Sequence, residues 1–582
     1  MLASHRSPSR RRGLIATVLA FSLLTAACGG SKANDTSKDV DFESEGLNSA
    51  AGESGLEDAG KPERGGTIVY ALEADSAGGY CLAEAQLAIS GMMVVRAFYD
   101  PLTAPNSEGE FVPYLAKSVT SNDDFTEWTI GIRKGIKFHD GTDLTAEVVR
   151  NNIDAYRGTY EGRSPLLFAF ILSNIESTEV KGDTVVVKTK VPWVAFPSFL
   201  NLSSRFGIMA QSQLDDPTSC SEKLVGTGPF VFKSWSKNDK IIGERNANYW
   251  QTAPDGKPYP YAEGIEYRFI PDGDVRLNSL ESSTGANAMH TTGPEQIGGK
   301  LKELRDAGKV NMLVSEDDAE VSFVQLNSTK PPFNDARMRR ALALAADRKE
   351  INDLLNDGLP TVAEGPFYKD SPGYLEDTGF PQYDLEAAKK LIAEYTAEGN
   401  KAEFTLTSTN DTATVRIAEM IQQKAQEVGV KVTIIQRDQA ALVNDAIGKE
   451  YQAMVFRNYP GGDPDANYVW WYGEGNPVNF GGFDDPVINK LLDEGRSEPD
   501  KAKRAKIYQD LNRQFAKEVW SVWAWFTPWA VAVDGDVHNI LGPPLPGEDP
   551  SKPGELTSDD PALQPRTGLA TGHSLLGMWI EQ

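Results

Sequence analysis

Residues 133–149 read RKGIKFHDGTDLTAEVV, and their order predicts a short strand, a tight turn and a helix. The apolar pattern at 136–139 indicates the strand, and Asp140-Gly141 indicates the turn because glycine accepts a positive φ. Thr145 can cap the helix that follows, and the helix dipole favours Glu147 in its first turn. Residues 127–132 alternate as a second strand, so we expect a hairpin around Lys134-Gly135 that leads into a helix.

Outward from this stretch, strand and helix patterns alternate along most of the chain. The strands we expect are 66–72, 183–191, 230–232, 323–327, 402–407 and 430–435, and the helices are 83–99, 335–346, 385–395, 412–428 and 501–515. Such β–α alternation predicts an α/β fold with a partly parallel sheet.

The overall composition is that of a soluble globular protein with an acidic surface. The chain has 582 residues, of which 40% are hydrophobic, and a formal net charge of −25. This length corresponds to several domain-sized units or to two large lobes. The negative charge argues against nucleic-acid binding and against adsorption to an anionic membrane, because both surfaces would repel it.

The first 27 residues are predicted to be an export signal. Four arginines precede an apolar segment over 14–24, which is too short for a stable membrane anchor. The sequence LTAACGG then surrounds Cys28 and is similar to a bacterial lipoprotein cleavage box, in which the cysteine is lipidated. Thr25 stands where the usual box has leucine. An ordinary signal with an unmodified Cys28 is the alternative, and the choice between Sec and twin-arginine export stays open.

Residues 28–64 are predicted to be a disordered tether. They are rich in Ser, Gly, Asp and Glu, and Phe42 is their only aromatic residue. Such a coil spans roughly 30 Å on average. No later stretch stays apolar for about 18 residues, so we do not expect the body to cross a membrane.

Two cysteines remain, Cys81 and Cys220. In an exported protein the simplest expectation for such a pair is one disulfide, and two free thiols are the alternative. The bond would close a long loop and contribute up to ~5 kcal/mol in the chain-entropy model.

The sequence offers no enzymatic constellation. It has no G-x-S-x-G, H-E-x-x-H, C-x-x-C or P-loop motif, and its five histidines are widely spaced. Adjacent acids such as Asp484-Asp485 are typical of a solvated turn. We therefore expect no catalysis, no metal site and no cofactor.

Several segments, taken in order, resemble the family 5 extracellular solute-binding proteins, the dipeptide-, oligopeptide- and nickel-binding components of ABC importers. The sharpest is residues 133–149. The others are GTGPF at 226–230, RN at 245–246 with YW at 249–250, PFND at 332–335 with RRAL at 339–342, and GDPD at 462–465. The order of the segments makes the resemblance specific.

The resemblance implies a two-lobe, periplasmic-binding-protein-like type II fold, often called a Venus flytrap, with an extra subdomain in the first lobe. Lobe I would comprise residues 65–322 and 533–582, with the subdomain near 101–225, and lobe II would comprise residues 323–532. Crossovers near 318–326 and 528–536 would form the hinge. Residues 133–149 are expected to serve the fold rather than the ligand.

Site residues follow from the same resemblance. Asp463 matches the position where peptide-binding relatives hold the ligand's α-ammonium, although it could instead merely cap a turn. Arg457 departs from the aromatic residue of relatives and could pair with a ligand carboxylate, pair with Asp463, or lie on the surface. Aromatic and amide side chains, for which core packing is the alternative, are expected to line the cleft: Trp470, Trp471, Asn479, Phe480, Phe483 and, more weakly, Tyr80. Trp520, Trp523, Trp525 and Trp529 are expected either to pack between the lobes or to contact the ligand, and the spacing of two from Trp523 to Trp525 indicates a strand that enters the hinge.

The implied function is that of a lipid-anchored substrate-binding protein of an ABC importer. It would be a monomer at the outer face of the cell membrane, capturing peptides and delivering them to permease and ATPase subunits. A sugar or metal-chelate ligand is the alternative within this class. A surface sensor or adhesion protein and a secreted hydrolase are alternatives from other classes.

Overall fold

The computed structural model describes Phe42, residues 60–540 except 77, 86, 166, 283–284, 370 and 460, and then 542–547, 563–564 and 575–582. The chain divides into residues 1–39 and 40–582, and every element below belongs to the second unit. The predicted signal peptide, Cys28 and most of the predicted tether lie outside the described residues.

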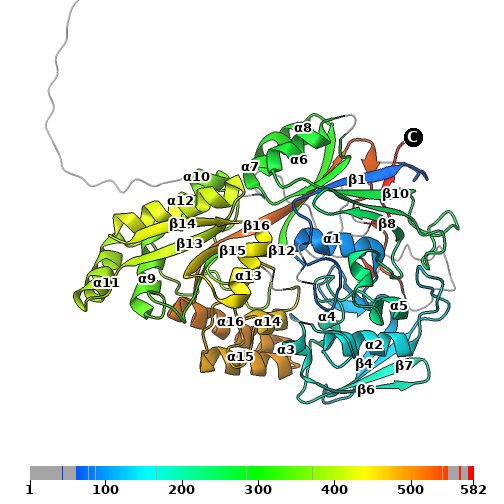
Figure 1. The fold of residues 1–582 in the computed structure, drawn as a ribbon, viewed down its shortest axis with the longest axis horizontal. Coiled ribbons are helices and arrows are strands. Elements are labelled where there is room, and N and C mark those ends of the chain that lie inside the picture. The colour runs from blue at the N-terminus through cyan, green and yellow to red at the C-terminus, as the bar shows by residue number, and fades with distance from the viewer. Residues whose placement is uncertain are drawn as a thin grey trace, which may run out of the picture. The chain divides into compact units, whose positions relative to one another are not determined.

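A ten-stranded mixed sheet forms the centre of the fold (Figure 1). Its order is β14 (Lys431–Arg437), β13 (Glu403–Thr409), β15 (Ala453–Asn458), β12 (Val310–Leu326), β16 (Ser521–Asp534), β11 (Ala288–Thr291), β1 (Thr67–Leu72), β10 (Gly264–Phe269), β9 (Lys240–Arg245) and β8 (Phe230–Ser236). Strands β1, β10 and β11 run parallel, as do β13, β14 and β15.

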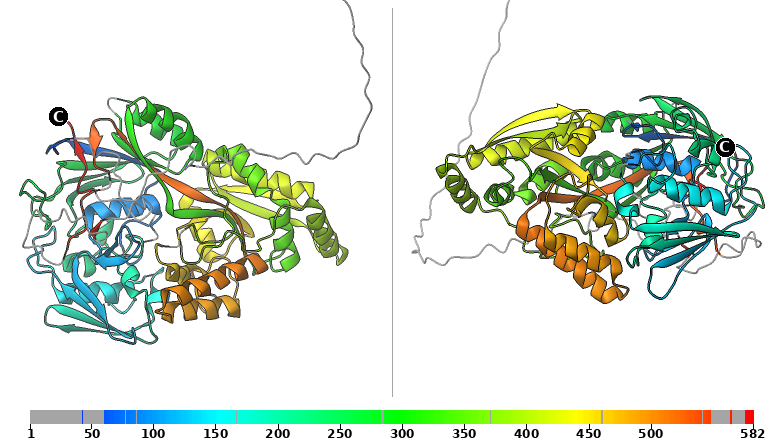
Figure 2. Two further views of the ribbon diagram at one scale, coloured as in Figure 1. Left: turned by 180° about the vertical axis from the view of Figure 1, so that it is seen from behind. Right: turned by 60° about the horizontal axis from the view of Figure 1, so that its bottom comes forward.

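The long strands β12 and β16 connect the two halves of this sheet (Figure 2). Residues 310–315 of β12 pair with β16 beside β11, and residues 320–325 pair with β16 beside β15. The register shifts between 315 and 320, at the start of the expected crossover. We call the half with β1 and β8–β11 lobe I, and the half with β13–β15 lobe II.

Lobe I carries an additional antiparallel sheet, in the order β4 (Ala116–Ser121), β5 (Glu127–Ile132), β7 (Thr184–Thr189) and β6 (Ile175–Lys181). This subdomain also holds a small hairpin, β2 (Thr103–Pro105) with β3 (Phe111–Pro113), and the helices α2 (Ala146–Tyr156), α3 (Ala169–Leu172), α4 (Phe196–Phe199), α5 (Gln211–Leu214) and η1 (Ser219–Ser221).

The stretch 133–149 folds largely as predicted. Thr145 caps α2 by accepting a hydrogen bond from the Val148 amide. The strand expected at 136–139 is wrong: this segment makes only an isolated bridge, Lys137 to Asp143. The chain turns back at once, and the His139 ring bonds Gly228 instead, with Nε2 donating to the Gly228 carbonyl and Nδ1 accepting from the Gly226 amide.

The segment 226–230 joins this hairpin to the helix α1 (Ile89–Phe98). A Cβ on Gly226 would lie 2.2 Å from the Phe98 carbonyl oxygen, and one on Gly228 would lie 2.5 Å from the Phe98 carbonyl carbon. Only glycine permits this backbone approach. Segments 133–149 and 226–230, two of those that carry the resemblance, therefore pack against each other and serve the fold.

Helix α1 begins at Ile89, six residues later than the sequence pattern predicts. Residues 81–85 form a turn, in which the Glu84 and Ala85 amides donate to the Cys81 carbonyl. Three further helical segments, α6 (Gly273–Leu280), α7 (Pro294–Gln296) with η2 (Ile297–Leu301), and α8 (Lys302–Asp306), cover the other face of the lobe I sheet.

Lobe II confirms the β–α alternation expected from the sequence. Its helices are α9 (Ala336–Ala345), α10 (Arg348–Asn356), α11 (Leu385–Ala397), α12 (Thr412–Glu427), α13 (Gln439–Gly448), α14 (Asn467–Trp471), α15 (Pro486–Ser497) and α16 (Lys501–Glu518), with a 3₁₀ turn η3 (Pro464–Ala466). An aspartate side chain caps all of these α-helices except α14: Asp335, Asp347, Asp384, Asp411, Asp438, Asp485 and Asp500. Part of the acidic composition thus stabilises helix N-termini.

The chain end returns to lobe I. Strand β18 (Trp579–Ile580) pairs with β17 (Val537–His538), and Ile580 and Gln582 lie against Gly66 at the start of β1.

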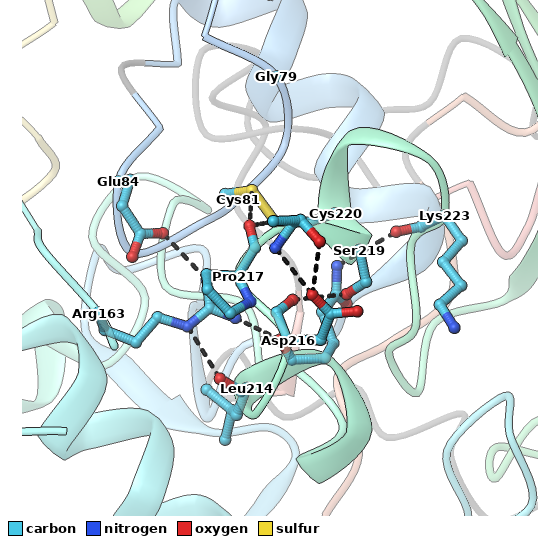
Figure 3. Close-up of a disulfide and its surroundings, with 12 residues drawn as sticks. Gly79, Cys81, Glu84, Arg163, Leu214, Asp216, Pro217, Ser219, Cys220 and Lys223 are labelled. Atoms are coloured by element: carbon cyan, nitrogen blue, oxygen red, sulfur yellow. Dashed lines mark hydrogen bonds and ion pairs between the residues drawn. A yellow bond between two sulfur atoms is a disulfide. The ribbon is translucent and has the colours of Figure 1, made fainter. Parts of the chain in front are cut away.

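The disulfide joins Cys81 and Cys220, whose Cα atoms lie 5.0 Å apart (Figure 3). Both cysteines belong to lobe I, so the bond braces this lobe without crossing between the lobes. The nearby Arg163 makes an ion pair with Glu84, 3.3 Å between Nη1 and Oε2.

We predict that reduction lowers the melting temperature and leaves ligand affinity nearly unchanged, because the bond constrains the unfolded chain and not the hinge. Calorimetry with and without reductant measures both quantities. A Cys81→Ser/Cys220→Ser variant is the control, and reductant should not change its melting temperature. Two titratable thiols in the mature, unfolded, unreduced protein would contradict the pairing.

Candidate functional site

The carboxyl ends of parallel strands from the two lobes face each other. Glu73 directly follows β1 and Thr292 directly follows β11, while Arg457 lies near the end of β15. Arg457 donates from Nη2 to Glu73 Oε1 at 2.5 Å and from Nη1 to Thr292 Oγ1 at 2.7 Å. In α/β proteins this edge of a sheet is where ligands usually bind.

Glu320 completes what we call the hinge cluster: Glu73, Thr292, Glu320 and Arg457. It belongs to β12, just past the register shift, and its Oε2 lies 3.5 Å from Arg457 Nε. Burial alone would raise the pKa of Glu73, but Arg457 outweighs it and lowers that pKa to about 2. Burial raises the pKa of Glu320 despite Arg457, and the charge of Glu73 raises it further.

These pKa shifts define the pH range in which the ion pair between Arg457 and Glu73 stabilises the contact between the lobes. Because the pKa of Glu73 is depressed when the lobes are in contact, the pair stabilises that state above the ordinary glutamate pKa of about 4.3. This stabilisation is lost as the pH falls towards about 2.

A strained turn from the subdomain adds a second cation. Leu202, Ser203 and Ser204 have consecutive φ values of 46°, 58° and 66°, which non-glycine residues adopt only at a cost. The next residue, Arg205, is buried and donates from Nε to the Leu87 carbonyl. Burial lowers the pKa of Arg205 to about 10, and the charge of Glu320 opposes this effect.

The hinge cluster is not sealed from solvent. The side chains of Arg457 and Glu73 retain 31% and 27% of their exposure. Two carboxylates and the Arg457 guanidinium lie close together where the lobes meet. This arrangement can pair with a ligand that carries charges of both signs.

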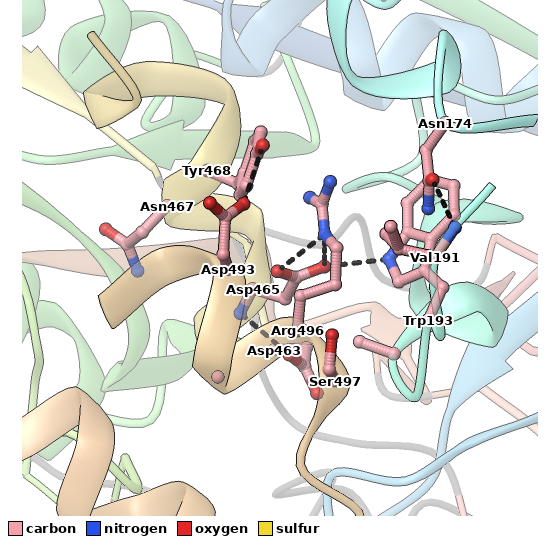
Figure 4. A network of polar contacts seen from close by, with 12 residues as sticks. Asn174, Val191, Trp193, Asp463, Asp465, Asn467, Tyr468, Asp493, Arg496 and Ser497 are labelled. Carbon is pink, nitrogen blue, oxygen red and sulfur yellow. Dashed lines mark hydrogen bonds and ion pairs between the residues drawn. The ribbon is translucent and has the colours of Figure 1, made fainter. Parts of the chain in front are cut away.

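A second set of contacts links the subdomain to lobe II, and we call it the rim network: Trp193, Asp465, Tyr468 and Arg496 (Figure 4). Trp193 Nε1 donates to Asp465 Oδ2 at 2.8 Å, and Arg496 Nε lies 3.2 Å from both oxygens of that carboxylate. The Arg496 guanidinium lies 3.5 Å from the Tyr468 ring centroid. The Val194 amide also donates to the Arg496 carbonyl.

Asp463 already has a cationic partner within lobe II. Its two oxygens accept hydrogen bonds of 2.5 and 2.9 Å from Arg504, and it caps η3 by accepting from the Asp465 amide. Its role as the amine-binding residue stays a prediction, and a ligand ammonium would have to share this carboxylate with Arg504. The neighbouring Asp465 is fully buried in the rim network rather than turned towards solvent.

The aromatic residues predicted for the cleft divide into two groups. Trp471 and Phe483 belong to the lobe II core, where Trp471 packs on Phe323 and Trp523. Asn479 is buried and organises its own loop by bonding the Phe483 carbonyl and the Gly482 amide. For these three the structure shows the alternative, core packing or loop closure, and ligand contact stays a prediction.

The other predicted side chains lie at different places. Trp470 and Phe480 pack together, and Phe480 also contacts Phe456 at the end of β15. Tyr80 is buried in lobe I, where its hydroxyl donates to Asp75, so it does not line an open cleft.

The tryptophans at 520–529 follow the hinge strand β16 rather than the space between the lobes. Trp523 lies in the lobe II core, and Trp520 stacks on Phe483. Trp529 stacks on His290 of lobe I, with ring centroids 4.7 Å apart. The strand predicted through Trp523 and Trp525 is confirmed.

Sequence reasoning missed Glu73, Thr292, Glu320, Arg205 and the whole rim network. One signal was present: Glu73 follows an apolar strand directly, at the position where ligand-contacting side chains are common. The others come from segments far apart in the chain, and their proximity depends on how the lobes meet.

The structure has two lobes joined by the hinge strands, with the carboxyl ends of their strands facing each other. This arrangement is the type II fold of periplasmic binding proteins. The solved structure of AgaA from A. tumefaciens R10 in complex with agropinic acid has a TM-score of 0.76, with 24% identity over 89% of this chain and 99% of that one. DppA from Helicobacter pylori, in complex with the peptide STSA, also gives 0.76, with 21% identity over 89% and 99%. The predicted fold class is confirmed.

The chain belongs to the bacterial extracellular solute-binding proteins of family 5. Residues 110–480 match this family, which is described as "Bacterial extracellular solute-binding proteins, family 5 Middle". Among curated proteins, the oligopeptide-binding protein AppA of Bacillus subtilis strain 168 is 25% identical over 537 residues, which cover 87% of this chain and 91% of that protein.

Two features are absent from the part of the chain that the structure describes. Among those residues, no helix combines the length and apolarity needed to cross a membrane. The same part of the chain holds no group of three or more His, Cys, Asp or Glu side chains suited to a metal ion.

We predict that Trp193→Phe weakens ligand binding about 10- to 150-fold. The substitution keeps an aromatic ring but removes the only hydrogen bond by which the Trp193 ring reaches lobe II in the described structure, and a hydrogen bond to a charged group contributes roughly 1.5–3 kcal/mol. Titration calorimetry measures the affinity.

Trp128→Phe in the same subdomain is the matched control. Trp128 is also buried, but its Nε1 has no hydrogen-bond partner among the described residues. Equal affinities of the two variants would show that the rim network does not stabilise the ligand-bound form.

Proposed function

We propose that this chain captures a peptide between its two lobes and delivers it to the permease of an ABC importer. The observation that carries the proposal is the hinge cluster, in which carboxylates and a guanidinium from both lobes lie close together and partly exposed. A peptide has an ammonium and a carboxylate, so it matches both signs. Family membership and the peptide-binding relatives support the proposal.

Arg457 is the proposed partner of the ligand carboxylate, and Glu73 is a partner for its ammonium. Both groups pair with each other when no ligand lies between them, so neither is left as an isolated charge. A ligand that replaces this contact gains charge-assisted hydrogen bonds to both lobes, which favours the closed form. Closure then marks the loaded protein for the permease.

A non-peptide ligand is the second candidate, and one observation favours it. AgaA, with the same fold, was solved with agropinic acid. The hinge cluster would suit another small solute with charges of both signs equally well.

We further propose that Cys28 is lipidated and anchors the protein at the outer face of the cell membrane. The cleavage-box sequence before Cys28 supports this, as does membership of an extracellular family. Transport energy would come from a separate ATPase subunit, and the chain itself would carry out no reaction.

Native mass spectrometry of protein purified from its own host identifies the co-purifying solute, which we expect to be a peptide. Calorimetry with that peptide and with its N-acetylated and C-amidated forms should then show weaker binding of both modified forms, because each lacks one charge. A solute of another class, or equal affinity for all three forms, would contradict peptide recognition through the termini.

Arg457→Gln tests the site itself. It should weaken binding of the same peptide roughly tenfold or more, because the ligand carboxylate loses its counter-ion. Arg437→Gln is the matched control: Arg437 lies on the edge strand β14 of lobe II, is 42% exposed and pairs with Asp445 of α13. Equal affinity of the two variants would remove Arg457 from the binding site.

A further inference from the structure

Phe42 is the one residue of the segment 28–59 that the structure describes, and it is fully buried. Its side chain has 0% exposure, although the surrounding sequence, KDVDFESEG over 38–46, is strongly polar. From its sequence alone, this segment is predicted to be disordered. An aromatic side chain buried from such a segment indicates a specific contact with the folded body.

The partner of Phe42 is an apolar cluster that belongs mainly to lobe I and includes Leu359 from the segment after α10 of lobe II. The cluster lies between the lobe I sheet and its covering helices and contains Ala71, Leu277, Leu280, Ala286, Met289, Ile297, Leu301, Leu304, Val310, Met312, Val314, Leu359, Ala530 and Ala532. Its side chains come from α6, η2 and α8, and from the lobe I ends of β12 and β16. Phe42 therefore occupies a position beside the strands that form the hinge.

The charges around the cluster match those around Phe42. Asp39, Asp41, Glu43 and Glu45 flank Phe42 in the sequence. The helical segments η2 and α8 present Lys300, Lys302 and Arg305, whose side chains retain 28–45% of their exposure. These three cations also pair with Glu281, Glu303 and Asp306, so the acidic flanks of Phe42 would add to ion pairs that already surround the apolar centre.

We propose that lobe I carries a docking site for the chain's own N-terminal segment, with Phe42 as its anchor. The apolar cluster binds the ring, and the basic side chains of η2 and α8 attract the acidic flanks. The site lies on the helical layer of lobe I and is separate from the hinge cluster and the rim network.

Docking shortens the free part of the tether. From Cys28 to Phe42 there are 14 residues, against 37 from Cys28 to Gly65. A flexible coil of 14 residues spans about 20 Å on average, whereas one of 37 residues spans about 35 Å. If Cys28 carries lipid, as proposed above, the body is held closer to the membrane with one helical face of lobe I towards the anchor.

Protease susceptibility tests the docking in the full-length mature chain. A glutamate-specific protease cuts after Glu43 and Glu45, beside the anchor. Phe42→Ser should raise the cleavage rate there roughly tenfold or more, because the fraction of undocked segment sets the rate. Leu47→Ser, which changes the next large apolar residue of the same segment, is the matched control and should leave the rate nearly unchanged.

Hydrogen exchange supplies a second readout. The amides of α6 and α8 should exchange faster in Phe42→Ser than in Leu47→Ser, and raising the salt concentration should speed cleavage of the wild type. Equal cleavage of wild type and Phe42→Ser, or unchanged exchange in these helices, would overturn the proposal. Ligand affinity should be the same in both variants, so a failure of docking is distinct from a failure of the proposed function.

Discussion

The contact between Arg457 and Glu73 is an ion pair between the two lobes, and the proposed function depends on it. It joins the end of a lobe II strand to the end of a lobe I strand at 2.5 Å. Burial disfavours the charged form of both groups. The charge of each partner outweighs this effect, so the pKa of Glu73 is lowered and the pKa of Arg457 is raised. When the lobes separate, water hydrates both groups. When the lobes meet, an unpaired charge here would be costly, so a ligand that enters this contact must carry complementary charges.

The rest of the architecture brings Arg457 and Glu73 together. Strands β12 and β16 are continuous through both lobes, and their pairing shifts register between the two halves of the sheet, where we expect the hinge. Parallel strands on either side bring their carboxyl ends towards each other. The rim network adds a second bridge through Trp193 and Asp465, far from the hinge strands in the sequence. The disulfide, in contrast, stabilises lobe I alone.

Much of this fold could be predicted from residue patterns, because local rules decide it. The capping of α2 by Thr145 and the strand–helix alternation of lobe II follow from side-chain spacing and are present as expected. The site was predicted far less well. Trp471 and Phe483 are residue types that are common in binding surfaces, but they pack in the core. Contact with apolar neighbours stabilises an aromatic side chain as much as contact with a ligand does. Asp463 matches a motif, yet Arg504, 41 residues later, neutralises it. Such pairings arise only when the chain has folded.

Small-angle X-ray scattering during titration with the co-purifying solute tests the central claim most directly, namely that ligand capture closes the lobes over the hinge cluster. The radius of gyration of the wild type should fall on saturation. Arg457→Gln should contract less even at saturating ligand, because one of its links between the lobes is missing, while Arg437→Gln should contract as the wild type does. Full contraction of Arg457→Gln, or no contraction of the wild type, would contradict this account.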